Sequence, residues 1–113
     1  MTIITVMAKK QPFVLIYDPE IRGHLDAIEP KYHSMIRAAI EEQLRFEPET
    51  ATRNRKPLER PIDLGATWEL RLGPGNRFRV FYRVDVEQRQ VRVLGVGVKE
   101  RNQVFLGGEE VQL

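Results

Sequence analysis

The alternation of hydrophobic and polar residues predicts one strand near the N-terminus and three in the C-terminal half. Residues 12–17, PFVLIY, form an unbroken apolar run with aromatic and β-branched side chains, typical of a strand covered on both faces. The segments TWELRL, RFRVFYRVDV and VRVLGVGV follow, separated by the turn sequences GPGN and EQRQ. Residues 91–98 are also apolar on both faces, so we expect this strand and 12–17 to be adjacent and central in the sheet.

Two helices are predicted between the first strand and the hairpin. Asp18 and Pro19 suit the N-cap and first turn of a short helix that ends near residue 27. A longer helix begins at Glu29-Pro30 and ends before Pro48. Its apolar side recurs with the 3.6-residue helical period at Tyr32, Ile36, Ala39, Ile40, Gln43 and Leu44.

This order predicts an α+β fold of two layers, with both helices on one face of a four-stranded sheet. The helices should pack on the side of the sheet that carries Trp68, Leu70, Leu72, Phe78, Val80 and Tyr82. We expect one domain over residues 1–113, with residues 1–11 as a tail or an extra edge strand. Residues 47–67 contain three prolines and are predicted to be a long connection.

Composition and charge narrow the possible classes of protein. The 113 residues are 42% hydrophobic and 30% charged, which is typical of a globular chain. The net charge is only +2, but basic residues gather in 53–60, RNRKPLER, and along 77–101. The chain has no cysteine, which excludes disulfides and thiolate metal sites. No apolar run approaches the roughly 20 residues of a membrane span, so we expect a soluble, cytoplasmic protein.

Strand alternation predicts that Glu69, Arg71, Arg77, Arg79 and Arg83 share the sheet face opposite the helices. Two interpretations remain open for this row. It could be a solvated surface with cross-strand pairs between Glu69 and arginine, or a site for phosphate, which guanidinium groups bind with paired donors. Residues 53–60 are open to the same two interpretations, a solvated loop or a second strip that contacts phosphate.

Other residues with functional chemistry have simpler explanations. His24 and His33 have no partner at catalytic or metal-ligand spacing, so we expect surface or capping roles. Trp68 and Tyr82 fall on the predicted core side and are interpreted as packing residues. The sequence contains no metal-ligand cluster, phosphate-binding glycine loop or nucleophile triad.

The hairpin WELRLGPGNRFRVFYRVD, followed by VRVLGVGVKERNQVF, resembles the RelE/ParE superfamily of bacterial toxins from type II toxin–antitoxin systems. The resemblance covers roughly residues 12–105 and rests mainly on the arginine after the turn, the RVFY strand and the VGVKERNQVF ending. It implies a RelE-like fold, a cognate antitoxin protein as partner, and no cofactor, metal or membrane.

The ribosome-dependent nuclease branch of this superfamily cleaves mRNA by attack of a 2′-hydroxyl on the adjacent phosphate. By position, the resemblance implies catalytic roles for Arg71, Arg79 and Lys99, where Lys99 would take part in proton transfer or charge stabilisation. It implies RNA-binding roles for Arg77, Arg83, Arg101 and Phe105. Glu69 is acidic where that branch tends to be basic, and Phe105 lacks the hydroxyl of the usual tyrosine.

Three functions therefore remain open. The leading hypothesis is a metal-independent mRNA endoribonuclease that acts on the ribosome. The first alternative is a ParE-like inhibitor of DNA gyrase, because that branch lacks the nuclease residues. The second is an inactive member that only binds its antitoxin.

Overall fold

The computed structural model describes residues 11–113, so the predicted N-terminal tail or edge strand falls almost entirely outside this range. The helices are α1 (Ile21–Asp26), α2 (His33–Leu44) and two single 3₁₀ turns, η1 (Pro30–Tyr32) and η2 (Pro74–Asn76). The strands are β2 (Val14–Tyr17), β3 (Arg55–Pro57), β4 (Trp68–Leu72), β5 (Phe78–Asp85), β6 (Gln90–Glu100), β7 (Gln103–Leu106) and β8 (Glu109–Val111). The α+β class is confirmed.

All the described strands belong to one mostly antiparallel sheet. Its order is β3-β4-β5-β6-β7-β8, and β2 pairs in parallel with the first part of β6. The long strand β6 thus has β5 along one edge, whereas its other edge is shared between β2 at residues 90–93 and β7 at residues 97–100. The predicted adjacency of the first strand and the 91–98 strand is confirmed.

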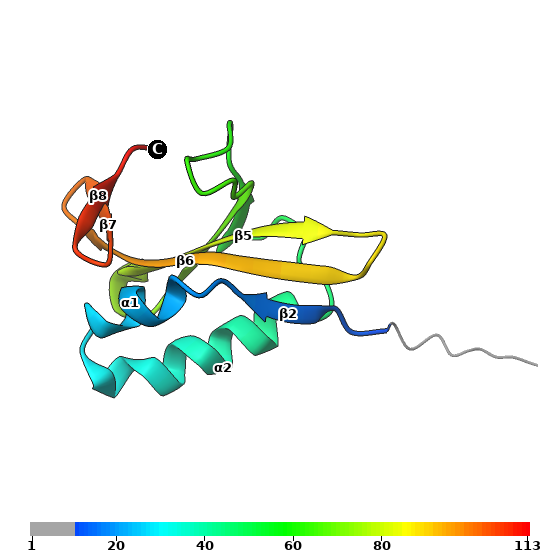
Figure 1. Ribbon diagram of the computed structural model, residues 1–113, viewed down its shortest axis with the longest axis horizontal. Helices are drawn as coiled ribbons and strands as arrows, with labels where there is room; N and C mark the ends of the chain where they lie inside the picture. Colours follow the sequence, from blue (N-terminus) through cyan, green and yellow to red (C-terminus); the bar gives the residue numbers. More distant parts are fainter. Residues whose placement is uncertain (1–10) are drawn as a thin grey trace, which may run out of the picture.

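The helices cover one face of this sheet (Figure 1). Ile36, Ile40 and Leu44 follow one another at four-residue spacing along α2, so they form one buried stripe. This stripe packs with Leu70, Leu72, Phe78, Val80 and Tyr82 from the sheet. The predicted side of the sheet therefore forms the main core, with Trp68 and Tyr82 stacked at 6.1 Å between ring centroids.

A β-bulge explains why β6 is apolar on both sides in sequence. Phe81 pairs with Gly95 and Tyr82 with Val93, so Leu94 is one residue too many on β6. The extra residue shifts the alternation by one. Odd-numbered valines face the helices before the bulge and even-numbered valines after it, namely Val91, Val93, Val96 and Val98. The strand is central, and its continuous apolar run combines this shift with burial on both faces, because Leu94 packs against hydrophobic side chains on the other side of the sheet.

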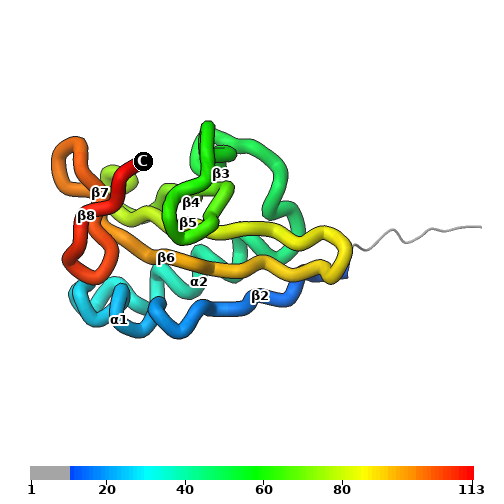
Figure 2. The backbone as a smooth tube through the Cα atoms, turned by 45° about the horizontal axis from the view of Figure 1, so that its top comes forward, coloured from blue at the N-terminus to red at the C-terminus, as the bar shows by residue number. Residues whose placement is uncertain are grey.

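A second, smaller core lies on the other face of the sheet. Phe81 is fully buried there, with Ile62 and Ala66 from the long connection and Val104 and Leu106 from β7. Figures 1 and 2 show the β7–β8 hairpin at one end of the sheet on this face, with its turn next to α1. The face that was predicted to be uncovered is therefore partly closed by segments distant in sequence.

Three expectations about the elements were wrong. The sheet has seven strands among the described residues rather than four, because β3 forms inside the predicted connection and β7 and β8 extend the sheet. Strand β2 is not covered on both faces, since Val14 is 61% and Tyr17 40% exposed. Among the described residues β2 pairs only with β6, which makes it an edge strand rather than a central one.

Candidate functional site

The strand register brings three predicted catalytic residues to one face of the sheet. Arg71 lies directly opposite Arg79, and Arg79 lies opposite Gly97. Lys99 is two residues beyond Gly97, so it shares this face. We call Glu69, Arg71, Arg79 and Lys99 the basic row. It lies near the turn between β4 and β5, on the side of the sheet away from the helices.

Glu69 joins the two arginines of the basic row. Its Oε1 accepts a hydrogen bond from Arg71 Nε and its Oε2 accepts one from Arg79 NH1, each at 3.1 Å. Arg79 Nε donates to the carbonyl of Asn76 at 3.2 Å. The exposed fractions are 5% for the Glu69 side chain, 6% for Arg79 and 33% for Arg71. The expected pairing between Glu69 and an arginine of the neighbouring strand is therefore present, but it is buried rather than exposed to solvent.

The burial of Arg79 corrects the expectation that all these arginines face solvent. Arg79 and Phe81 are two residues apart on the same face, and Phe81 is covered by the second core. Gly97, opposite Arg79, has no side chain, and a Cβ there would lie 2.6 Å from Leu106 and from the Phe105 carbonyl. This absence lets β7 approach closely, which helps to close the sheet around Arg79.

Arg77 does not belong to the basic row. Its backbone is helical (φ −66°, ψ −31°) because it ends the η2 turn, and β5 begins only at Phe78. Strand alternation therefore does not extend to it. Its guanidinium lies 3.9 Å from the Glu29 carboxylate and 5.9 Å from the Tyr32 ring centroid, at the start of the helical layer. The predicted shared face for Arg77 was wrong.

Phe105 also lies away from Arg79. It pairs with Val98, whose side chain belongs to the main core, whereas its neighbours Val104 and Leu106 belong to the second core. Directly paired residues point to the same side of a sheet, so Phe105 lies on the helical side. Stacking of Phe105 on a base held at the basic row is not supported by this arrangement.

The remaining predicted residues are exposed. Lys99, Arg83 and Arg101 are all on the surface, and none forms an ion pair within residues 11–113. Arg83 lies opposite Arg92 across the β5–β6 pair, and Arg101 has a positive φ of 59° in the turn before β7. These side chains are available to a partner. Arg101 lies at the turn, beyond the row itself.

Residues 53–60 divide between the two faces. Arg55 is buried, with 7% exposed, and its NH1 donates to the Gln43 carbonyl in the last turn of α2, where a positive charge is favoured. Lys56 is exposed and lies directly opposite Glu69. Lys56 therefore shares the face of the basic row. The sequence alone gave no reason to single out Lys56 among the charged residues of RNRKPLER.

The two histidines have structural contacts. His33 Nε2 lies 2.8 Å from the carbonyl oxygens of Leu25 and Ile28, so it caps the end of α1 as expected. His24 was expected at the surface but is buried, and its Nδ1 accepts a hydrogen bond from the Val96 N–H at 3.2 Å. Burial lowers the pKa of His24, while Glu20 and Asp18 act in the opposite direction.

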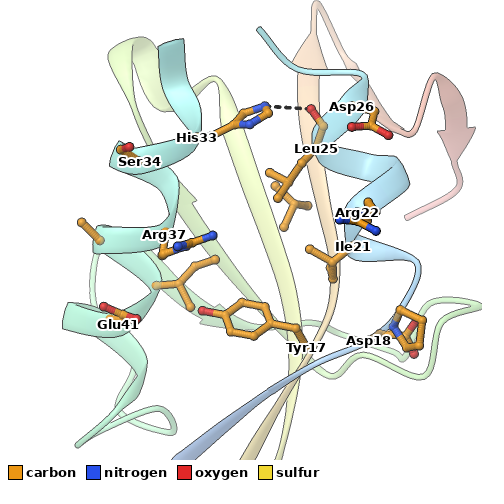
Figure 3. A pocket seen from close by; sticks show the side chains of 14 residues that line it. Tyr17, Asp18, Ile21, Arg22, Leu25, Asp26, His33, Ser34, Arg37 and Glu41 are labelled. Carbon is orange, nitrogen blue, oxygen red and sulfur yellow. Dashed lines mark hydrogen bonds between the residues drawn. The ribbon is translucent and has the colours of Figure 1, made fainter. Parts of the chain in front are cut away.

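A separate hollow of about 1030 Å³ lies between α1 and α2 (Figure 3). The Tyr17 ring points into it toward Arg37 and Glu41, and burial, then Glu41, raises the pKa of Tyr17. Its walls carry both charges and include none of the predicted site residues. Among residues 11–113, no group of acidic or histidine side chains could hold a metal ion, and no helix is long and apolar enough to cross a membrane.

Neither a protein-family model nor a curated protein matches the sequence. Among solved structures, the chain is similar to a chain in the crystal structure of the toxin–antitoxin complex RelBE2 from Mycobacterium tuberculosis. The two share 25% identity with a TM-score of 0.58, and the match covers 78% of this chain and 99% of the other. The resemblance to RelE-type toxins is thereby confirmed.

Proposed function

We propose that this chain, which has the fold of RelE-type toxins, is the toxin of a type II toxin–antitoxin pair. The similar solved chain comes from a toxin–antitoxin complex, and the match extends over nearly all of that chain. The proposed partner is a protein antitoxin. Exposed basic side chains on the face of the basic row suit an acidic partner segment, and such a complex should weaken as salt rises.

The activity that we propose is metal-independent cleavage of mRNA on the ribosome. The observation that carries it is the register that places Arg71, Arg79 and Lys99 on one face at one end of the sheet. In such a cleavage the 2′-hydroxyl gives up its proton to a water molecule and its oxygen forms a bond to phosphorus. The bond to the 5′-oxygen breaks, and negative charge builds on the phosphate. Arg71 would stabilise that charge directly. Arg79, which is buried, would stabilise the same charge from the interior side of the site.

Lys99 has the second role in this proposal. It is exposed at the end of β6, on the same face as Arg71 and without a carboxylate partner among the described side chains. An ammonium group in this position could donate a proton to the leaving 5′-oxygen or neutralise the phosphate. The chemistry requires no cofactor, because the cationic side chains take the place of a metal.

Inhibition of DNA gyrase is the second candidate. The specific observation in its favour is that Glu69 already occupies donors of both Arg71 and Arg79. Phe105, without a hydroxyl, lies on the other side of the sheet and is unavailable as a proton donor at this row. A toxin that binds a protein target would not require free guanidinium groups here.

Expression of the chain alone, and together with the product of the neighbouring gene, tests the proposal. We expect growth to stop when the chain is expressed alone and to recover when an antitoxin is present. Primer extension on translated mRNA should reveal cleavage, and plasmid supercoiling by gyrase should be unaffected. Intact mRNA with blocked supercoiling would support the gyrase alternative instead, and normal growth with neither effect would leave only antitoxin binding.

A further inference from the structure

The carboxylate of Glu69 sits between two guanidinium groups in the way that a phosphate would. One oxygen accepts from Arg71 and the other from Arg79, both at 3.1 Å. Arginine binds a phosphate through the same kind of paired, charge-assisted contacts to two oxygens. The basic row therefore already contains an anion, and that anion is supplied by the protein itself.

The three side chains of this internal contact differ in their exposure to solvent. Glu69 and Arg79 are almost fully buried, whereas a third of the Arg71 side chain is exposed. Lys56 lies opposite Glu69 and is exposed, as is Lys99 at the end of the row. An incoming phosphate would thus meet Arg71 and the two lysines first, and would reach Arg79 only where Glu69 now lies.

We propose that Glu69 is a built-in competitor for the phosphate of RNA, so that full engagement of the basic row requires its carboxylate to turn away. This inference rests on the proposed nuclease function and describes the regulation of the same site. An exchange of one anion for another leaves the buried Arg79 paired throughout, which avoids the high cost of an unpaired buried charge. Binding of RNA and breaking of the Glu69 contacts are then one event.

Two variants of Glu69 test its hydrogen-bond contacts to the arginines and its negative charge separately. Glu69→Asp keeps the negative charge but shortens the side chain by one methylene, which withdraws the carboxylate from the arginines. Glu69→Gln keeps the length but removes the charge. Glu100→Gln is the matched control, because it makes the same change of charge at an exposed position beside Lys99. Thermal melting identifies any variant that does not fold.

The probe is a short single-stranded RNA with a fluorescent label, and its affinity for each folded protein is measured by anisotropy. We expect Glu69→Asp and Glu69→Gln to bind the RNA about tenfold more tightly than the native chain, the size of one additional charged contact. Adding Arg79→Met to either variant should cancel the gain. Equal affinity of Glu69→Asp and the native chain would overturn the proposal, as would an equal gain in Glu69→Gln and Glu100→Gln.

This binding assay needs neither ribosomes nor cleavage, so its failure is distinct from that of the proposed function. Tighter RNA binding by Glu69→Asp without any cleavage in cells would support the competitor and reject the nuclease. Cleavage by the native chain without tighter binding in Glu69→Asp would support the nuclease and reject the competitor.

Discussion

Glu69 on β4 and Arg79 on β5 form an ion pair at 3.1 Å, with 5% and 6% of their side chains exposed. A buried pair of this kind contributes most visibly when one partner is removed, because the other is left as an unpaired buried charge. The sheet end that carries the candidate site is thus also a part of the structure on which folding depends.

Arg79→Ala should therefore destabilise the protein, by about 3–5 kcal/mol. The sequence placed Arg79 on the sheet face opposite the helices, but its side chain is buried there, so its removal leaves Glu69 without its buried partner. Urea denaturation followed by circular dichroism measures the free energy of unfolding. The double change Glu69→Leu with Arg79→Met should recover much of the loss, and Arg83→Ala, at an exposed site, should alter stability by less than about 0.5 kcal/mol. A fully stable Arg79→Ala protein would contradict the structure.

Arg71→Ala should separate activity from stability. Its side chain is one-third exposed and makes one contact to Glu69, so the fold should survive. If Arg71 stabilises charge on the scissile phosphate, cleavage of translated mRNA should fall about a hundredfold or more. The rate is measured by primer extension at matched protein levels. Arg92→Ala is the control, since Arg92 is exposed and lies nearer the other end of β6.

Tyr82→Phe should cost about 1–3 kcal/mol of stability. The Tyr82 hydroxyl donates to the Pro48 carbonyl at 2.6 Å, and both residues are fully buried. Burial raises the pKa of Tyr82, so the hydroxyl remains a donor throughout the neutral range. Tyr17→Phe, at a 40% exposed position, is the matched control and should change the unfolding midpoint little. Equal effects of the two changes would contradict this role.

Two glycine-to-alanine changes should act in opposite directions. A Cβ on Gly97 would lie 2.6 Å from the Phe105 carbonyl, so Gly97→Ala should destabilise by about 1–3 kcal/mol. Gly23 lies within α1 with no atom close to its Cβ position, so Gly23→Ala should stabilise by about 0.5–1 kcal/mol. Both are measured by thermal and urea unfolding. A neutral or stabilising Gly97→Ala would show that the β6–β7 contact is looser than described, and a destabilising Gly23→Ala would contradict the open space at that position.

Stability should fall in mild acid because of His24. Its pKa lies below the ordinary value of 6.5, so below that pH the unfolded chain takes up a proton that the folded chain resists. This contribution is present above pH 6.5 and is lost as pH falls toward the lowered pKa. Protonation would also remove the acceptor for the Val96 N–H.

The measurement compares the native chain with His24→Asn, whose side-chain oxygen can accept the same bond without titrating. Free energies of unfolding at about pH 7.5 and about pH 5.5 should differ more for the native chain than for the variant. An identical pH dependence in both would assign the acid sensitivity to the carboxylates instead.

Local patterns predicted the helical layer and the hairpin well. The spacing of Ile36, Ile40 and Leu44 alone identifies the buried side of α2. The bulge at Leu94 could not be predicted, because valines on both sides of a shifted alternation look the same as a strand buried on two faces. Strand β3 was missed because three residues ending in Pro57 carry little strand signal.

The candidate site was predictable by face but not by burial. Alternation correctly joined Arg71 and Arg79, because it depends only on neighbouring residues. The residues that cover Phe81, on the same face of β5 as Arg79, come from β7 and from the connection before β4, which no local pattern relates to β5. The predicted face of Arg77 was wrong for a different reason, because the η2 turn extends one residue further than the hairpin pattern implied.

The pairing of β2 with β6 has a consequence for synthesis of the chain. Val14 lies opposite Gln90, so the first strand emerges from the ribosome long before its only described partner exists. Parallel contacts between such distant segments form slowly, because a long loop must close first. We therefore expect the sheet of the nascent chain to remain incomplete until β6 has been synthesised. The basic row also stays incomplete until then, because Lys99 lies near the end of β6.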